Sequence, residues 1–391
     1  MLRNIHLTYV IGGLMWARFF IPVLALFYIA SEVPLEQFAV IMGVFALAIL
    51  LLEIPSGIIA DLLGKKKTLI ISRSLYVVEI ILIAFCNGFW IFLIAKIISG
   101  VGVSMSSGTG ESLIFDSLKK MKKEKDYKKV SGRLSTISNL VSAVIFITGG
   151  FLFAVSPKLP AIASIPLVAF GVFLTFFLTE PYKPSKKLKI KNSILHLKES
   201  FTYLKKSNYI KYLVIYSFPI AAIITITMSL SAAYFKAISF PIYLMGFLAF
   251  IGALLIALSA KNAHKIEEWL GERKTLRLIQ LAMIIGIGVV SLMIPYWSVF
   301  GYFLIPLSAG FFGVVLSNYM NLHLKSSHRA TLISIKNFFS NLAVFILFPI
   351  VGYISLKYSM QVSFIFLGGM FILTLIILYP LARRWKLNKI N

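Results

Sequence analysis

The chain has 391 residues, of which 59% are hydrophobic and only 14% are charged. Soluble domains carry about 25% charged residues, so this composition excludes an ordinary water-soluble globule as well as a disordered chain, and favours a protein with many membrane-spanning helices. The formal net charge of +25 is typical of nucleic-acid-binding proteins, but the placement of the charges, described below, argues against that role.

Residue types that carry out enzymatic chemistry are scarce. Cys86 is the single cysteine, so a disulfide within the chain is excluded. All five histidines fall in polar connections, and the sequence has no HExxH, no nucleotide-binding glycine loop and no G-x-S-x-G. We therefore expect no enzymatic activity, no metal site and no cofactor.

Apolar runs long enough to cross a membrane recur along the whole chain. A spanning helix needs about 20 apolar residues. Twelve such runs are predicted, at 7–30, 35–59, 68–87, 89–112, 131–155, 160–179, 211–235, 241–260, 276–294, 297–321, 330–355 and 360–381. The first run is too long for a signal peptide, so we keep it in the mature protein. The sequence predicts an all-α integral membrane protein with twelve transmembrane helices.

Lys and Arg gather in alternate connections. One predicted side holds 34 of the 39, and the other side holds only Lys158, Lys236 and Lys357. Short basic loops stay in the cytoplasm, so both termini are predicted to be cytoplasmic. The positive charge then reflects topology and attraction to anionic lipids, and not binding of nucleic acid. The composition, rich in Lys, Ile and Phe, favours a bacterial source and hence the cytoplasmic membrane.

An internal repeat relates the two halves of the chain. Residues 60–69 read ADLLGKKKTL, and residues 267–276, an offset of 207, read EEWLGERKTL, so that five of ten positions are identical. A weaker repeat at an offset of 202 pairs Gly150 with Gly352. The longest connection, the basic linker 181–210, separates an N-terminal six-helix bundle (1–180) from a C-terminal one (211–391). Two parallel six-span halves, with substrate bound between them, are one known transporter plan.

The segment from Gly57 to Lys67, GIIADLLGKKK, resembles the signature loop between spans two and three of the major facilitator superfamily. The resemblance implies two pseudo-symmetric six-helix bundles in a monomer. It also implies a gating loop in which Asp61 accepts hydrogen bonds from the start of span eleven, where a helix dipole favours an anion. We expect Gly57 and Gly64 to allow unusual dihedrals or close approach. The residues assigned to the gating loop are Gly57, Asp61, Gly64, Lys65, Lys66 and Lys67, and those of the repeat loop are Glu268, Gly271, Arg273 and Lys274.

Charged residues within the predicted spans are expensive to bury and therefore mark functional candidates. In the first half we single out five of them, Arg18, Glu53, Glu79, Lys96 and Glu111, and in the second half none. Glu79 and Lys96 flank the turn at 87–88 almost symmetrically, which predicts an ion pair. Lys96 and Glu111 fall on similar sides of one helical wheel, so we expect them to face the same space. With three carboxylates against two cations, Glu53 or Glu111 is the expected proton carrier.

These features together favour a secondary active transporter that works by alternating access. We expect proton-coupled movement of a small amphipathic solute, with efflux as the favoured direction. An uptake permease, or an exporter of a siderophore or envelope precursor, is an alternative. A non-transporting membrane receptor or scaffold is an alternative from another class.

Overall fold

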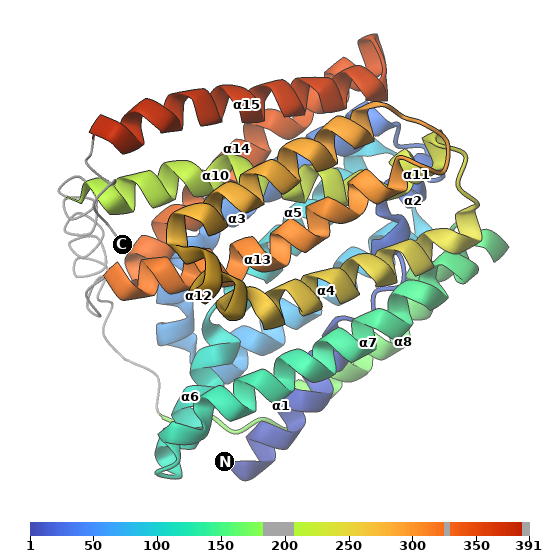
Figure 1. Ribbon diagram of the computed structural model, residues 1–391. Helices are drawn as coiled ribbons and strands as arrows, with labels where there is room; N and C mark the ends of the chain where they lie inside the picture. The colour runs from blue at the N-terminus through green and yellow to red at the C-terminus, as the bar shows by residue number, and fades with distance from the viewer. Residues whose placement is uncertain (183–206, 324–328, 385–391) are drawn as a thin grey trace. The chain divides into compact units, whose positions relative to one another are not determined.

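The computed structural model describes residues 1–182, 207–323 and 329–384. Most of the predicted linker, residues 183–206, lies outside the described residues, as do residues 327–328 of the predicted partner segment of Asp61 at the start of span eleven, 327–331. Every regular element of the described chain is helical (Figure 1). The fold class expected from the apolar runs, an all-α membrane protein, is confirmed.

The first half of the described chain supplies eight α-helices that account for six predicted spans. The second predicted span forms one helix, and the third ends at the expected turn before Gly88. The first and fourth spans are each interrupted. In chain order the elements are α1 (Leu2–Met15), η1 (Ile21–Val23), α2 (Leu24–Ile29), α3 (Leu35–Leu63), α4 (Lys65–Phe85), α5 (Phe89–Ser106), α6 (Thr109–Lys120), η2 (Glu124–Asp126), α7 (Tyr127–Val155) and α8 (Leu159–Thr175).

The second half repeats this order with longer continuous helices. Its elements are α10 (Asn208–Ser229), α11 (Ser231–Ala237), η3 (Ile242–Leu244), α12 (Met245–Ser291), α13 (Val299–His323), α14 (Arg329–Lys357) and α15 (Met360–Arg384). Helix α12 contains two predicted spans and bends between them at Gly271. Two helical stretches therefore meet at a kink at Gly271, in the place of the predicted connection between spans eight and nine.

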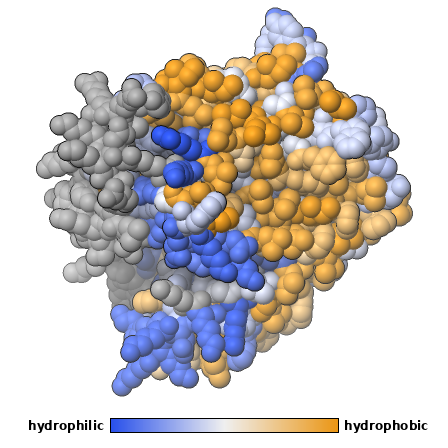
Figure 2. All heavy atoms as spheres, in the orientation of Figure 1, coloured by the Kyte–Doolittle hydropathy of each residue, from blue (hydrophilic) through white to orange (hydrophobic). Residues whose placement is uncertain are grey.

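Ten helical segments of the described chain are long and apolar enough to cross a membrane. The other two predicted spans are the interrupted first one and α8, whose 17 residues fall just short. Large apolar side chains face outward along these segments, and Trp90, Trp269 and Trp297 are among the most exposed. Figure 2 shows the helix bodies as predominantly apolar, with hydrophilic side chains gathered around α6 and the bend of α12. A membrane is the solvent that makes such a surface stable.

The chain forms two compact units, and each includes a short segment from the other half of the sequence. One unit comprises 1–34, 44–190 and 242–250, and the other comprises 35–43, 191–241 and 251–391. In the first unit, α4 packs against α5 and α8, and α1 packs against α7 and α8. In the second unit, α10 packs against α13, α14 and α15. The bundle boundaries expected from the linker stay a prediction, because the compact units follow packing and not the linker alone.

Glycines allow these two short segments, 242–250 and 35–43, to pack closely against the unit that contains them. A Cβ on Gly150 of α7 would lie 2.8 Å from the backbone nitrogen of Gly246. In the other unit, a Cβ on Gly352 of α14 would lie 2.4 Å from the Cβ of Ala39 in α3. Gly150 and Gly352 are the pair related by the weaker sequence repeat, and residues 39 and 246 are related by the stronger repeat's offset of 207. The repeat therefore preserves a packing contact as well as a loop.

The stronger repeat preserves a backbone conformation. Gly64 has φ 88° and ψ 154°, and Gly271 has φ 72° and ψ 164°. This region of dihedral space is open almost only to glycine. Both residues lie between one predicted span and the next, so the two halves use the same glycine-dependent bend.

Replacing Gly271 with alanine is expected to lower the free energy of unfolding by about 1–3 kcal/mol, because a Cβ strains this conformation. No atom of the described chain lies within 4 Å of the new methyl group, so steric overlap contributes nothing. The matched control is Gly288→Ala, in the same helix, where the site is exposed and equally open. Alanine should stabilise that position by about 0.5–1 kcal/mol. Denaturant unfolding in detergent measures both, and equal effects would contradict the assignment.

Candidate functional site

The first span is broken in the middle of its predicted length. Helix α1 ends at Met15, and helical structure resumes at Ile21. The free N–H of Phe19 donates to Ser164 Oγ of α8 at 3.0 Å. Its carbonyl oxygen lies against α7, where a Cβ on Gly149 would approach it to 2.1 Å. Irregular backbone at membrane depth is tolerated where other parts of the protein satisfy it, and α7 and α8 do so here.

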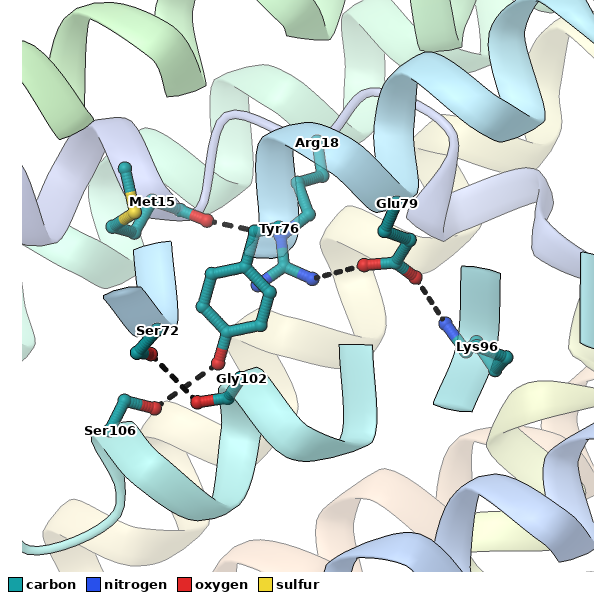
Figure 3. Close-up of polar contacts among 8 residues, drawn as sticks. All are labelled: Met15, Arg18, Ser72, Tyr76, Glu79, Lys96, Gly102 and Ser106. Atoms are coloured by element: carbon teal, nitrogen blue, oxygen red, sulfur yellow. Dashed lines mark hydrogen bonds and ion pairs between the residues drawn. The ribbon is translucent and has the colours of Figure 1, made fainter. Parts of the chain in front are cut away.

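The break places Arg18 beside a buried ion pair (Figure 3). Lys96 Nζ on α5 donates to Glu79 Oε1 on α4 at 3.0 Å. Glu79 Oε2 lies 3.8 Å from Arg18 Nη1, which is an ion pair but too long for a hydrogen bond. The Glu79 side chain has no exposed surface, and those of Lys96 and Arg18 are 8% and 18% exposed. The three residues form a cluster of one carboxylate and two cations, called the charge cluster below.

Aromatic rings and hydroxyls fix the position of the charge cluster. The Arg18 guanidinium carbon lies 4.4 Å from the ring centroid of Tyr76, within the range of a cation–π contact. The Tyr76 hydroxyl lies 3.1 Å from Ser106 Oγ, and the Ser72 hydroxyl donates to the Gly102 carbonyl oxygen at 2.7 Å. Figure 3 shows these contacts joining α4 to α5 on the side of the cluster. The charges are therefore held by helices that are themselves tied together.

The structure confirms the Glu79–Lys96 ion pair and adds Arg18 to it. It does not bring Glu53 or Glu111 to the charge cluster. Glu53 lies half-buried on α3, and Glu111 is exposed in the first turn of α6. The expectation that Lys96 and Glu111 share one helix face is wrong, because the helix breaks at residues 107–108, where Gly108 adopts φ 69°. A helical wheel applies only along a continuous helix.

Arg73 is a buried cation near the start of the third predicted span that the sequence analysis did not single out. It lies on α4 with 8% of its surface exposed, and its Nη1 donates to Thr175 Oγ1 of α8 at 2.7 Å. Arg73, Tyr76 and Glu79 follow one another at intervals of three residues on α4, so they share one helix face. This spacing is the signal by which the sequence could have assigned Arg73 to the same face as Glu79.

The gating loop divides into residues with and without a visible role. Gly64 provides the bend described above, whereas Gly57 is helical and no atom of the described chain lies within 4 Å of a Cβ built on it. The expectation of unusual dihedrals at Gly57 is therefore wrong, and the described residues show no close approach there. Asp61 is exposed at the end of α3. Because part of its expected partner segment lies outside the described residues, the latch on span eleven stays a prediction.

The lysines of the gating loop lie at the start of α4, and the acidic residue Glu180 caps this end of the helix. Glu180 Oε1 and Oε2 accept hydrogen bonds from the backbone N–H groups of Lys65 and Lys66 at 3.0 and 2.7 Å. The Lys65 ammonium group pairs with Asp116 of α6 and donates to the Ser112 carbonyl oxygen. A carboxylate at a helix N-terminus satisfies unpaired N–H groups and complements the dipole. Glu180 takes the capping role within its own unit, and sequence reasoning missed it because 115 residues separate it from Lys65.

Replacing Glu180 with alanine is expected to lower the free energy of unfolding by about 1–2 kcal/mol, because two backbone donors lose a charged acceptor. Thermal unfolding in detergent measures the loss. Glu124→Ala is the control, because Glu124 is exposed in η2 and should change stability little. An unchanged unfolding temperature in the Glu180 variant would show that the cap contributes nothing.

The repeat loop surrounds the bend in α12. Glu268 and Lys274 are exposed on either side of Gly271, whereas the Arg273 side chain lies outside the described part of the chain. The neighbouring Glu272 accepts a hydrogen bond from the Tyr209 hydroxyl of α10. Like the gating loop, this bend is tied to another helix of its own unit by a carboxylate.

Comparison with known proteins gives one family and one fold. A family model described as Major Facilitator Superfamily matches residues 6–327. No curated protein sequence matches the chain. Among solved structures, the nucleoside transporter NupG is similar at a TM-score of 0.80 and 13% identity, over 97% of this chain and 98% of that one.

Two further solved structures share the fold at similarly low identity. A bacterial homologue of the human lysosomal transporter Spinster is similar at a TM-score of 0.76 and 14% identity, over 100% of this chain and 98% of that one. A D-xylose–proton symporter is similar at a TM-score of 0.72 and 14% identity, over 96% and 97%. With the family model covering most of the described helices, the chain belongs to the major facilitator superfamily, as a secondary transporter and not an enzyme.

Proposed function

We propose that this transporter couples solute movement to protons through ionisable residues in its first six spans. The observation that carries the proposal is the buried charge cluster of Arg18, Glu79 and Lys96 beside a broken span. Buried charges cost several kcal/mol each even when paired, and packing of a helical bundle does not require them. Charges retained at that cost in a membrane transporter favour a role in the transport path.

The proposed proton carrier is one of the two carboxylates outside the charge cluster. Glu79 belongs to the charge cluster, and the other two carboxylates singled out in the first six spans are Glu53 and Glu111. Glu53 is half-buried on α3, and Glu111 is exposed at the start of α6, next to the break at Gly108. A similar solved structure is named a D-xylose–proton symporter, which supports proton coupling as the working proposal for this chain.

The solute that we propose is small and amphipathic, because the helices offer many apolar and few charged side chains. Export is the favoured direction, and uptake is the alternative. The proposed setting is the cytoplasmic membrane of a bacterium, with a monomer whose termini and basic loops face the cytoplasm and its anionic lipids. The similar structures are named for nucleosides, D-xylose and peptides, so they favour no single substrate.

The test is solute-dependent proton flux in liposomes that contain the purified protein and a trapped pH-sensitive dye. A panel of small solutes is added under an imposed pH gradient, in either direction. We expect at least one solute to change the internal pH with the wild type, and either Glu53→Gln or Glu111→Gln to abolish that change. Glu124→Gln, at an exposed site outside the spans, is the control. Full proton-coupled flux in both Glu53→Gln and Glu111→Gln would overturn the proposal. Solute flux that does not depend on the pH gradient would overturn it as well.

A further inference from the structure

We propose that the charge cluster binds one anionic group of the transported solute, a carboxylate, sulfonate or phosphate, with the Arg18 guanidinium as its direct contact. This inference rests on the proposed function, because it names the chemistry of the solute at the same site. It specifies the amphipathic solute proposed above as one that has an apolar body and a single negative group. Three observations support it: the unused donors of Arg18, the charge balance, and a second buried cation.

Arg18 keeps hydrogen-bond donors that the described chain does not use. Its Nε donates to the Met15 carbonyl oxygen at 3.2 Å. Nη1 faces Glu79 at 3.8 Å, beyond hydrogen-bonding distance, and Nη2 donates to no residue that the structure describes. A guanidinium carries five N–H donors in a planar fork that matches a carboxylate, sulfonate or phosphate. With the Tyr76 ring against one face of the guanidinium, an incoming anion would approach along its edge.

The cluster carries one positive charge in excess when all three groups are ionised. Lys96 already pairs with Glu79 at hydrogen-bonding distance, so the excess resides on Arg18. A net charge in an apolar surrounding is unstable unless a partner neutralises it. One anionic group would bring the charge of the cluster to zero, whereas a cationic group would raise it to two. The balance therefore selects for anionic over cationic solutes.

Arg73 adds to the same imbalance. It is buried on the helix face that carries Tyr76 and Glu79, and within the described residues it donates a hydrogen bond to a neutral threonine, Thr175. Within the described residues, the buried charged side chains are Arg73, Lys96 and Glu79, two cations and one anion, before the partly exposed Arg18 is counted. The positive excess is thus a property of the region around α4 and not of one side chain.

The experiment compares three aromatic probes of similar size and different charge. They are benzenesulfonate, which is permanently anionic, neutral benzenesulfonamide, and the cation phenyltrimethylammonium. The unfolding temperature of the purified full chain in neutral detergent is measured across a concentration series of each, at constant ionic strength. Binding to the folded state raises this temperature. We expect benzenesulfonate to raise it saturably and the other two to leave it unchanged. Equal shifts for the three probes, or none for benzenesulfonate, would overturn the proposal.

Variants then assign the effect to the charge cluster. Arg18→Gln removes the excess charge and should weaken benzenesulfonate binding by about tenfold or more. Arg18→Lys keeps the charge without the fork, so it should retain selectivity for the anion with weaker binding. Glu79→Gln raises the excess charge to two and should strengthen binding. Arg3→Gln is the control, because Arg3 is a cation on α1 that contacts Thr179 at the exposed end of the helix. An unchanged benzenesulfonate shift in Arg18→Gln and Arg18→Lys would overturn the assignment.

A phosphate from lipid is the other source of such an anion, and a short-chain phosphatidylglycerol added to the detergent tests it. A shift caused by this lipid but not by benzenesulfonate would contradict a site for the solute. The binding assay needs no pH gradient, so its outcome is separate from that of proton coupling. Anion binding without proton-coupled flux would contradict the proposed function but not this inference. Proton-coupled flux without anion-selective binding would contradict this inference but not the proposed function.

Discussion

Replacing Glu79 with glutamine is expected to lower the free energy of unfolding by about 3–5 kcal/mol and to abolish transport. The carboxylate is fully buried and pairs with both Lys96 and Arg18. Removing one member of a buried ion pair leaves the other charge without compensation, and here two cations would be left. Denaturant unfolding in detergent measures the stability, and flux in liposomes measures the activity.

A double substitution separates this effect from a loss of packing. Glu79→Gln together with Lys96→Met leaves one buried cation in place of two, so part of the lost stability should return. The coupling energy between the two sites should then be positive and well above the error of the measurement. If the double variant is less stable than Glu79→Gln by the full cost of Lys96→Met alone, the two residues do not interact and the pair contributes nothing.

Replacing Gly149 with alanine is expected to displace the broken segment of the first span. The new Cβ would lie 2.1 Å from the Phe19 carbonyl oxygen and 2.9 Å from Pro22 Cγ. Backbone cannot move aside as a flexible side chain can, so we expect a loss of about 3 kcal/mol or more in the free energy of unfolding. Because Arg18 precedes Phe19, the displacement should also weaken benzenesulfonate binding.

The same helix offers a matched control for this substitution. Gly132 lies on α7 with an exposed position and no atom of the described chain within 4 Å of a new Cβ. Gly132→Ala should therefore be neutral or stabilise by up to about 1 kcal/mol, as expected for an open site in a helix. Comparable unfolding curves for the two variants would show that α7 does not support the break.

Sequence reasoning succeeded where local patterns decide the structure. Runs of apolar residues predicted the spans, and the short turn at Gly88 predicted that Glu79 and Lys96 would lie at similar depth. The repeat predicted that Gly64 and Gly271 occupy equivalent positions, and both adopt the same unusual dihedrals. Each of these features depends on residues close together in the chain or on direct comparison of two segments.

Sequence reasoning failed where contacts between residues that are distant in the sequence decide the structure. The break after Met15 depends on Ser164, which lies 145 residues beyond Phe19, and on Gly149. Pro22 is a local signal, because a proline disturbs a helix near residue i−4, here Arg18. Helices α3 and α10 nevertheless continue through Pro55 and Pro219, so the sequence did not single out this break or the position of Arg18 beside Glu79. Likewise, a wheel drawn through residues 96–111 misplaced Glu111, because the interruption at Gly108 was not foreseen.

The exchange of short segments between the compact units has a consequence for chain fragments. A polypeptide that ended before residue 181 would lack residues 242–250, so the backbone of Gly150 would lose the neighbour that it meets at Gly246. A polypeptide that began after residue 210 would likewise lack the stretch around Ala39 that covers Gly352. Each fragment alone should be a substrate for cellular proteolysis, whereas two fragments synthesised together should protect each other, since the exposed glycine surface of one is completed by the other.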